Sequence, residues 1–249
     1  MSGHSKWSQI KRQKGVADAK RGQLFTKLGK EISVAVRQGG SDPQANARLR
    51  LAVQRARDNN MPLENIERAI KHAAGSSDAG TLAEVTLEGY GPGGSAILLQ
   101  ALTDNRNRTL SEVRNIFSRG SVSLGESGCV SWIFEPKGVI TVEVNNVDAE
   151  ELALFAIDAG ADDVKIDEAI VEIHTQPEDM EEVRRVLEEK GIEISAAELL
   201  RVPKTMIRLD EKSALQSLKL LDKLEELDDV QHVFTNADFP DEVVENYQG

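Results

Sequence analysis

The sequence predicts an α+β protein in which an N-terminal three-helix domain is followed by two α/β domains, the second inserted into the first. Three observations carry this prediction. Apolar residues recur at helical spacing over the first 75 residues, strand-like alternation begins at Thr81, and the stretch from Gly138 to Val202 has the element order of a ferredoxin-like plait. The predicted domains are residues 1–78, residues 79–135 with 204–249, and residues 136–203.

The N-terminal domain begins with a helix predicted from Arg21 to Arg37. Leu24, Leu28 and Ile32 lie four residues apart in it, which places them on one buried face.

Two more helices complete this domain. Asp42 is expected to cap the second helix, with Pro43 at its first position and its end near Asp58. Pro62 opens the third helix, which Gly75 closes. Together the three helices are expected to bury one core.

A hairpin is predicted next. Val85 and Leu87 alternate with polar residues, and the apolar run 95–102 forms the second strand. Residues 89–94 match G-x-G-x-x-G, the dinucleotide-binding pattern. That pattern requires a following helix whose N-terminus faces the pyrophosphate, whereas here a strand follows. The glycines therefore indicate a turn.

The rest of this second domain is divided by the insertion. Residues 109–112 have the form of a capping box and open a helix, and a strand with Val130, Trp132 and Phe134 follows. After the insertion, a strand at 205–209, a leucine-rich helix and a strand at 230–235 are expected to complete the same sheet. The acidic end 241–249 is expected to fray.

The inserted domain reads as strand, helix, strand, strand, helix, strand, which is the split βαβ plait. Its strands are predicted near residues 138–144, 163–167, 169–175 and 195–202. Pro136 and Pro203 lie at its two edges, where connections to another sheet are expected.

Charge is strongly segregated along the chain. Residues 1–75 hold 15 Lys and Arg against 6 Asp and Glu, a net charge of +9, whereas the remaining 174 residues carry −21. A basic segment of this kind attracts phosphates, and an acidic body repels them. Chance clustering of charges on solvated helices is the alternative explanation.

The basic N-terminal run is the strongest functional feature, because its cations gain by neutralising phosphates and releasing counterions. Trp7 is able to stack on a base, or alternatively to anchor the run to the helices. Further arginines of the second helix extend the basic surface at a spacing of seven residues. The candidate nucleic-acid-binding residues here are Lys6, Trp7, Lys11, Arg12, Lys14, Lys20, Arg21, Lys27, Arg48 and Arg55.

A second candidate is the polar loop 104–108, where Arg106 and Arg108 are expected to meet phosphates or base edges. Helix capping and ion pairing explain Asp104 and Thr109 better than ligand binding does, and they explain the two arginines equally well.

Other functional classes find little support. The single cysteine, Cys129, excludes an intramolecular disulfide and fits a reducing cytoplasm, and it is expected to be a packing residue. The four histidines lie in separate segments, so no metal site is predicted. No catalytic motif, leader or membrane span is recognised. We therefore expect a cytoplasmic protein without enzymatic activity, cofactor, small-molecule substrate or membrane partner.

Two stretches resemble the YebC family: Gly3-His4-Ser5-Lys6-Trp7 with Ile10-Lys11, and residues 104–109 continuing to Ser118. The resemblance extends over the whole chain, including residues 65–70 and 89–92. It implies three domains, the first helical, and a probable DNA-binding transcriptional regulator. The mitochondrial members of the family include the translational activator of cytochrome c oxidase subunit one, and some members act on the ribosome in translation.

The sequence is therefore interpreted as a non-enzymatic nucleic-acid-binding regulator of gene expression that binds DNA through its basic first domain. The alternative is a ribosome-associated translation factor that binds ribosomal RNA with the same surface. A third hypothesis is an acidic scaffold that binds basic proteins through the −21 body, and a hydrolase is the least favoured.

Overall fold

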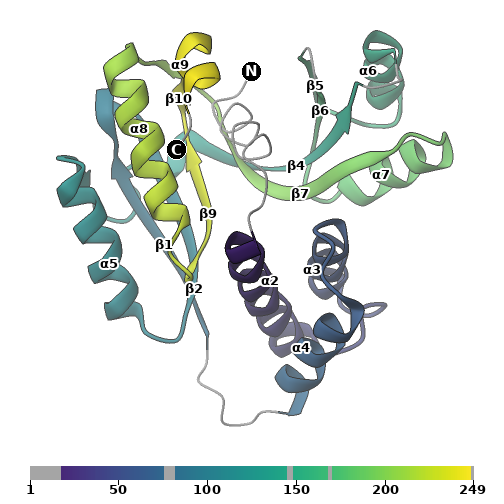
Figure 1. Cartoon of the computed structure of the whole chain (residues 1–249). Coiled ribbons are helices and arrows are strands. Elements are labelled where there is room, and N and C mark those ends of the chain that lie inside the picture. The colour runs from purple at the N-terminus through teal and green to yellow at the C-terminus, as the bar shows by residue number, and fades with distance from the viewer. Residues whose placement is uncertain (1–17, 76–81, 145–147, 168–169, 248–249) are drawn as a thin grey trace. The chain divides into compact units, whose positions relative to one another are not determined.

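The computed structural model describes residues 18–75, 82–144, 148–167 and 170–247 (Figure 1). The chain divides into two compact units. One contains residues 135–202 together with 58–60, and the other contains the helical N-terminal domain and the remaining α/β elements. The predicted fold class is confirmed: helices come first and mixed α/β elements with antiparallel sheets follow.

The N-terminal domain contains the three predicted helices. They are α2 (Asp18–Gly39), α3 (Ala47–Asp58) and α4 (Leu63–Gly75). Leu28 and Ile32 of α2, Leu49 of α3 and Ile66 of α4 meet in one core and are almost fully buried. The four-residue spacing that predicted α2 thus does define its buried face.

The predicted cap of α3 is wrong. The backbone N–H of Leu49 donates to Oδ1 of Asn46 at 3.0 Å, so Asn46 and not Asp42 caps the helix. Asp42 instead begins a turn, in which its side chain accepts from the backbone N–H of Gln44. Asn46 also donates to the carbonyls of Ala35 and Gly40, which fixes the connection from α2.

The hairpin is confirmed. Strand β1 (Ala83–Tyr90) pairs antiparallel with β2 (Ala96–Thr103) across a turn that contains the short 3₁₀ helix η1 (Pro92–Gly94). The full sheet has the order β3-β1-β2-β9, with β3 at Ser123–Leu124 and β9 at Val230–Thr235. Strand β9 joins this sheet, as predicted, and it does so by pairing with β2.

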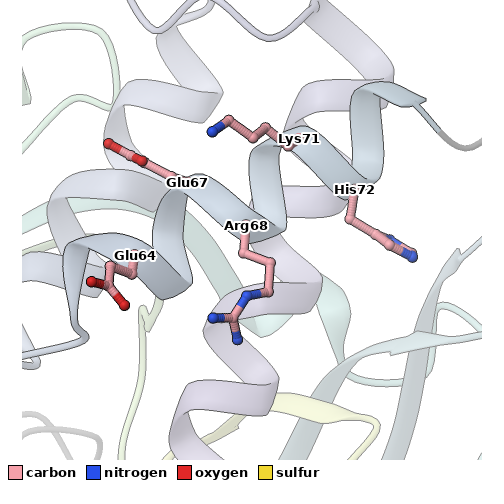
Figure 2. Close-up of a pocket in the computed structure, with 5 residues that line it drawn as sticks. All are labelled: Glu64, Glu67, Arg68, Lys71 and His72. Atoms are coloured by element: carbon pink, nitrogen blue, oxygen red, sulfur yellow. The ribbon is translucent and has the colours of Figure 1, made fainter.

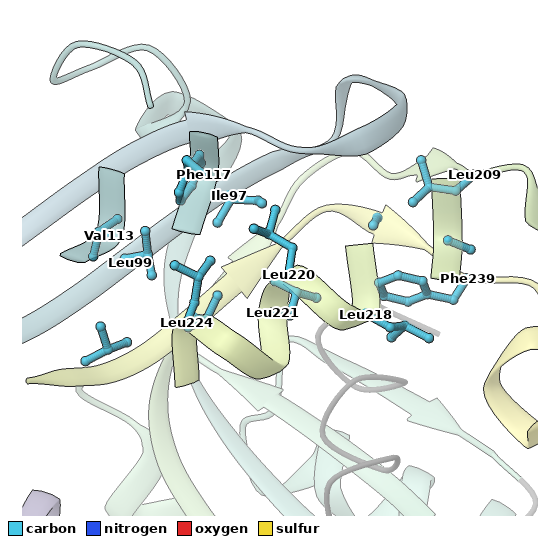
Figure 3. Close-up of a cluster of buried hydrophobic side chains, with 14 of the residues drawn as sticks. Ile97, Leu99, Val113, Phe117, Leu209, Leu218, Leu220, Leu221, Leu224 and Phe239 are labelled. Atoms are coloured by element: carbon cyan, nitrogen blue, oxygen red, sulfur yellow. The ribbon is translucent and has the colours of Figure 1, made fainter. Parts of the chain in front are cut away.

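Helices α5 (Arg106–Arg119) and α8 (Glu211–Glu225) pack on this sheet and on one another. Figure 3 shows the shared core, in which Ile97 and Leu99 of β2 meet Phe117 of α5 and Leu221 of α8. Space is tight at Gly89, because an added Cβ would lie 2.6 Å from the ring of Phe117. A glycine at this position lets α5 approach the strand.

The predicted capping box is wrong, because α5 begins earlier. Asn105 is the N-cap and accepts from the backbone N–H of Arg108 at 3.1 Å, so Thr109 lies inside the first turn. The predicted strand through Val130 and Trp132 is also wrong. Residues Ser131–Ile133 form the 3₁₀ helix η2, and strand β4 starts at Phe134.

The C-terminal segment differs from expectation in two places. Strand β8 (Ile207–Arg208) does not join the large sheet but pairs in parallel with β10 (Ala237–Asp238). The predicted frayed tail contains helix α9 (Asp241–Asn246). The hydroxyl of Tyr247, just after α9, donates to Asp222 of α8, and the apolar residues near it pack on the core.

The inserted unit has the predicted element order. Its sheet has the strand order β5-β6-β4-β7, the arrangement of a ferredoxin-like plait. Pro136 and Pro203 lie within the first and last strands and not in linkers. The elements are β4 (Phe134–Glu143), α6 (Ala149–Asp158), β5 (Asp163–Ile166), β6 (Ile170–Thr175), α7 (Met180–Glu189) and β7 (Ile194–Pro203).

Candidate nucleic-acid interface

Much of the predicted basic run precedes the part of the chain that the structure describes. Lys6, Trp7, Lys11, Arg12 and Lys14 lie outside the described residues. The backbone of Lys20 belongs to the first turn of α2, and Arg21 follows it as an exposed residue. Lys20 and Arg21, which follow those residues in the run, thus belong to a regular helix.

The next cations of α2 contact the acidic part of the same unit. Nζ of Lys27 donates to the carbonyl of Glu225 at 2.5 Å. Nζ of Lys30 donates to the carboxylate of Asp229 at 2.7 Å and to the carbonyl of Asp228 at 3.0 Å. Lys27 and Lys30 therefore attach α2 to the end of α8 and the loop before β9.

The arginines of α3 are also engaged in internal contacts. Arg55 forms an ion pair with Glu31 of α2 and lies 3.1 Å from Nε2 of His232 on β9. Arg48 forms an ion pair with Glu84 of β1 at 2.8 Å. The seven-residue spacing was expected to extend a basic surface, but these two guanidinium charges are balanced by carboxylates of the protein itself.

Burial and charge act in opposite directions on Glu31. Removal from water would raise the pKa of its carboxyl, but the attraction of Arg55 and the hydrogen bond from His232 outweigh that effect and lower the pKa to about 2. Glu31 is thus ionised throughout the neutral range and holds α3 and β9 on α2.

The two arginines of the polar loop 104–108 differ in their contacts. Arg108 donates to Asp104 at 2.8 Å and to the buried carboxylate of Asp229 at 2.7 Å, so it is an ion-pairing residue. Thr109 is fully buried and donates to Asp229 at 2.8 Å. Arg106, by contrast, is exposed at the first position of α5.

Helix α5 is a basic element in an otherwise acidic body. Its sequence contains four arginines and one acidic residue, Glu112. Arg114 and Arg119 are exposed along it, as Arg106 is. The exposed surface of α5 thus carries cations and amides, with Glu112 as the one carboxylate of the helix.

A shallow hollow on the outer face of α4 carries charges of both signs. Figure 2 shows its lining side chains, all from this one helix: Glu64, Glu67, Arg68, Lys71 and His72. A solvent-facing stripe along a single helix does not enclose a small molecule.

Within the described ranges, no group of three His, Cys, Asp or Glu side chains is arranged to hold a metal ion. In the same ranges, no helix is both long and apolar enough to cross a bilayer.

Sequence reasoning missed one exposed feature. In the described part of the chain, Trp132 and Tyr90 are the two aromatic residues among the exposed large hydrophobic side chains. The alternation of Val130, Trp132 and Phe134 predicts a strand, whereas Trp132 lies in η2. Alternation of apolar residues gave no signal of the 3₁₀ turn that directs its ring outward.

Comparison with known proteins gives matches over nearly the whole chain. The model of the TACO1/YebC N-terminal domain matches residues 5–76, and that of the TACO1/YebC second and third domain matches residues 82–237. A probable transcriptional regulatory protein of Dehalococcoides mccartyi is 60% identical over 247 residues, covering 99% of this chain and 98% of that protein. One of Chloroflexus aggregans is 53% identical over 250 residues, covering 99% of each.

A solved structure is also similar. The crystal structure of a conserved hypothetical protein of Aquifex aeolicus superposes with a TM-score of 0.84 at 49% identity, covering 90% of this chain and 92% of that one. Its fold therefore supports the element order described above.

Proposed function

The chain belongs to the TACO1/YebC family, and from that premise we propose that it is a non-enzymatic regulator of gene expression that binds DNA through its basic N-terminal segment. The names of its relatives, probable transcriptional regulatory proteins, support the regulatory role.

The observation that carries DNA binding is the segregation of charge. Residues 1–75 have a net charge of +9 and the rest of the chain −21. Lys27, Lys30, Arg48 and Arg55 are engaged with the acidic body or with Glu31. The cations that precede α2, with Lys11, Arg12 and Lys14 at their centre, are therefore assigned to the phosphate backbone, and exposed Arg106 to a second contact.

The acidic body orients the complex. A polyanion held by the N-terminal segment is repelled by the carboxylate-rich surfaces of the −21 body, so poses that bring phosphates onto those surfaces are disfavoured. Binding of this kind is electrostatic and only weakly selective for sequence, because phosphate contacts position a protein without reading bases.

The test is a salt titration of binding to a short DNA duplex. If about five phosphates are neutralised, the slope of log K against log salt is about −4 to −5. The K11A/R12A/K14A variant is expected to flatten that slope by about two to three. A slope that this variant leaves unchanged overturns the assignment.

A matched control removes the same charge from the body. Lys212, Lys219 and Lys223 are exposed on α8, and the K212A/K219A/K223A variant is expected to keep the wild-type slope. The same titration on a structured RNA hairpin decides between the two nucleic acids. Tighter binding to the hairpin than to the duplex would show that the preferred ligand is structured RNA. The proposed role would then be regulation of translation and not of transcription.

A further inference from the structure

Two exposed aromatic side chains converge on one backbone carbonyl. The hydroxyl of Tyr90, at the end of β1, and Nε1 of Trp132, in η2, donate to the carbonyl oxygen of Cys129 at 3.0 and 3.1 Å. The two residues remain 43% and 67% exposed. Both rings are therefore fixed at their polar edges while much of their surface faces solvent.

The loop beneath them is held by a buried carboxylate. Glu88, 4% exposed, accepts from the backbone N–H groups of Gly128, Val130 and Ser131 at 2.7 to 2.8 Å. Burial would raise the pKa of this carboxyl, but the three N–H groups outweigh burial and lower it, so the charge persists at neutral pH. A fixed loop reduces the entropy cost of ordering a ligand on Trp132.

The chemistry of Tyr90 and Trp132 limits the class of ligand that they are able to bind. The Tyr90 hydroxyl and the Trp132 indole N–H already donate to the carbonyl of Cys129, so the surface of the pair that remains exposed is mainly aromatic carbon. Residues 125–128 beside it are exposed Gly, Glu, Ser and Gly, and none of the other large exposed hydrophobic side chains of the described residues belongs to this loop. Aromatic faces on a polar rim favour a flat, polar-edged partner over an aliphatic one.

A cation contacts the backbone of Trp132. The exposed residue Lys204 donates from its backbone N–H to the carbonyl of Ile133 at 2.9 Å, and its Nζ lies 3.3 Å from the carbonyl oxygen of Trp132. Proteins that bind single-stranded nucleic acids combine aromatic side chains, on which the bases stack, with cations, which contact the phosphates.

We propose that Trp132 and Tyr90 form a stacking platform for an unpaired nucleobase, with Lys204 contacting the adjoining phosphate. This assignment rests on the proposed function and adds to it. The N-terminal segment binds phosphates of any strand, whereas the platform prefers single-stranded segments.

The chain contains two tryptophans, so the W7F variant leaves Trp132 as its only indole. Titrating W7F with oligo(dT) is expected to quench the emission of Trp132, and a fully paired duplex of the same length is expected to bind without quenching. In the W132A variant, affinity for oligo(dT) is expected to fall about 5- to 150-fold, the range for one stacked base, with duplex affinity unchanged. W132F is expected to recover most of the loss.

A matched control is L215A, which truncates an exposed apolar residue of α8. It is expected to bind oligo(dT) like wild type, and the unfolding midpoint of W132A checks that its fold is retained. Oligo(dT) that binds, as measured by fluorescence anisotropy, without quenching Trp132 overturns the platform and leaves the proposed function in place. Failure of both oligo(dT) and the duplex to bind at low salt overturns both.

Discussion

The guanidinium of Arg108 donates to Oδ2 of Asp229 at 2.7 Å, although the two residues are 121 positions apart. The other carboxylate oxygen of Asp229 accepts from Lys30 at 2.7 Å. Burial would raise the pKa of Asp229, but the hydrogen bonds from Arg108, Lys30 and Thr109 hold it well below its usual range. One carboxylate thus connects α2, the start of α5 and the strand β9.

The first prediction concerns this carboxylate. D229N is expected to lower the free energy of unfolding by roughly 1–3 kcal/mol. The neutral amide no longer balances the charge of Lys30, and it cannot accept all the hydrogen bonds that the carboxylate accepts from buried Thr103 and Thr109. Urea denaturation measures the change. The control is D228N, which alters an exposed neighbour and is expected to change the free energy by less than about 0.5 kcal/mol. Equal effects of the two variants would contradict the role given to Asp229.

The second prediction separates the two loop arginines. R108A is expected to lower stability, because it removes a donor to the buried carboxylate of Asp229. R106A is expected to leave stability unchanged and to reduce duplex affinity modestly, with a salt slope flatter by about one. Thermal unfolding and the salt titration, run on both variants, supply the measurements. If R106A lowers stability and R108A flattens the salt slope instead, the phosphate contact belongs to Arg108.

The third prediction is a dependence on pH. Glu31 has an ordinary pKa of 4.5 when unfolded and about 2 when folded, so its stabilising effect is complete above about pH 4.5 and is lost as pH falls toward 2. E31Q is expected to be less stable than wild type by about 1–3 kcal/mol at pH 7, and this difference is expected to shrink between pH 4.5 and 3. Guanidinium unfolding at each pH tests it, with E64Q on the exposed face of α4 as the control. A constant difference would show that Glu31 does not act through its charge.

The fourth prediction concerns Cys129. Burial and the nearby charge of Glu88 raise the pKa of its thiol, so little of it is thiolate at neutral pH. Alkylation by iodoacetamide is expected to be slower than that of free cysteine at pH 7 and to rise with pH along a curve displaced to higher pH. No second thiol in the chain contributes to the rate. A profile that coincides with that of free cysteine would exclude this environment.

The fifth prediction is that residues 135–203 fold on their own. The unit contains all four strands of its sheet and buries apolar residues such as Ile140, Leu152, Ile173 and Leu187. The isolated fragment is expected to unfold cooperatively in urea and to show mixed α/β circular dichroism. Non-cooperative loss of signal would mean that the plait requires the rest of the chain.

Elements with strong periodicity could be predicted from the sequence. The spacing of Leu24, Leu28 and Ile32 defined α2, and the alternation around Val85 defined the hairpin. Caps were predicted less well, because several residues near each helix start have side chains of the right type. Only the backbone path decides between Asp42 and Asn46.

The candidate site was harder to predict, because its determinants are non-local. The sequence gives the positions of the cations but not their partners. Arg55 lies 177 residues from His232, and Lys30 lies 199 residues from Asp229. The acidic composition after Asp241 likewise predicts a frayed tail. The contact of Tyr247 with Asp222 on α8, which holds this segment, cannot be predicted from the composition of the tail.

The hydrogen bond between the backbone N–H of Lys204 and the carbonyl of Ile133 has a consequence for modularity. It holds together the two points at which the chain leaves the second domain and returns to it. A short turn is therefore long enough to join Ile133 to Lys204, and excising the intervening residues changes the loop-closure entropy without stretching the backbone. We therefore expect that the inserted unit can be removed, or replaced by a unit of different length, without straining the rest of the second domain.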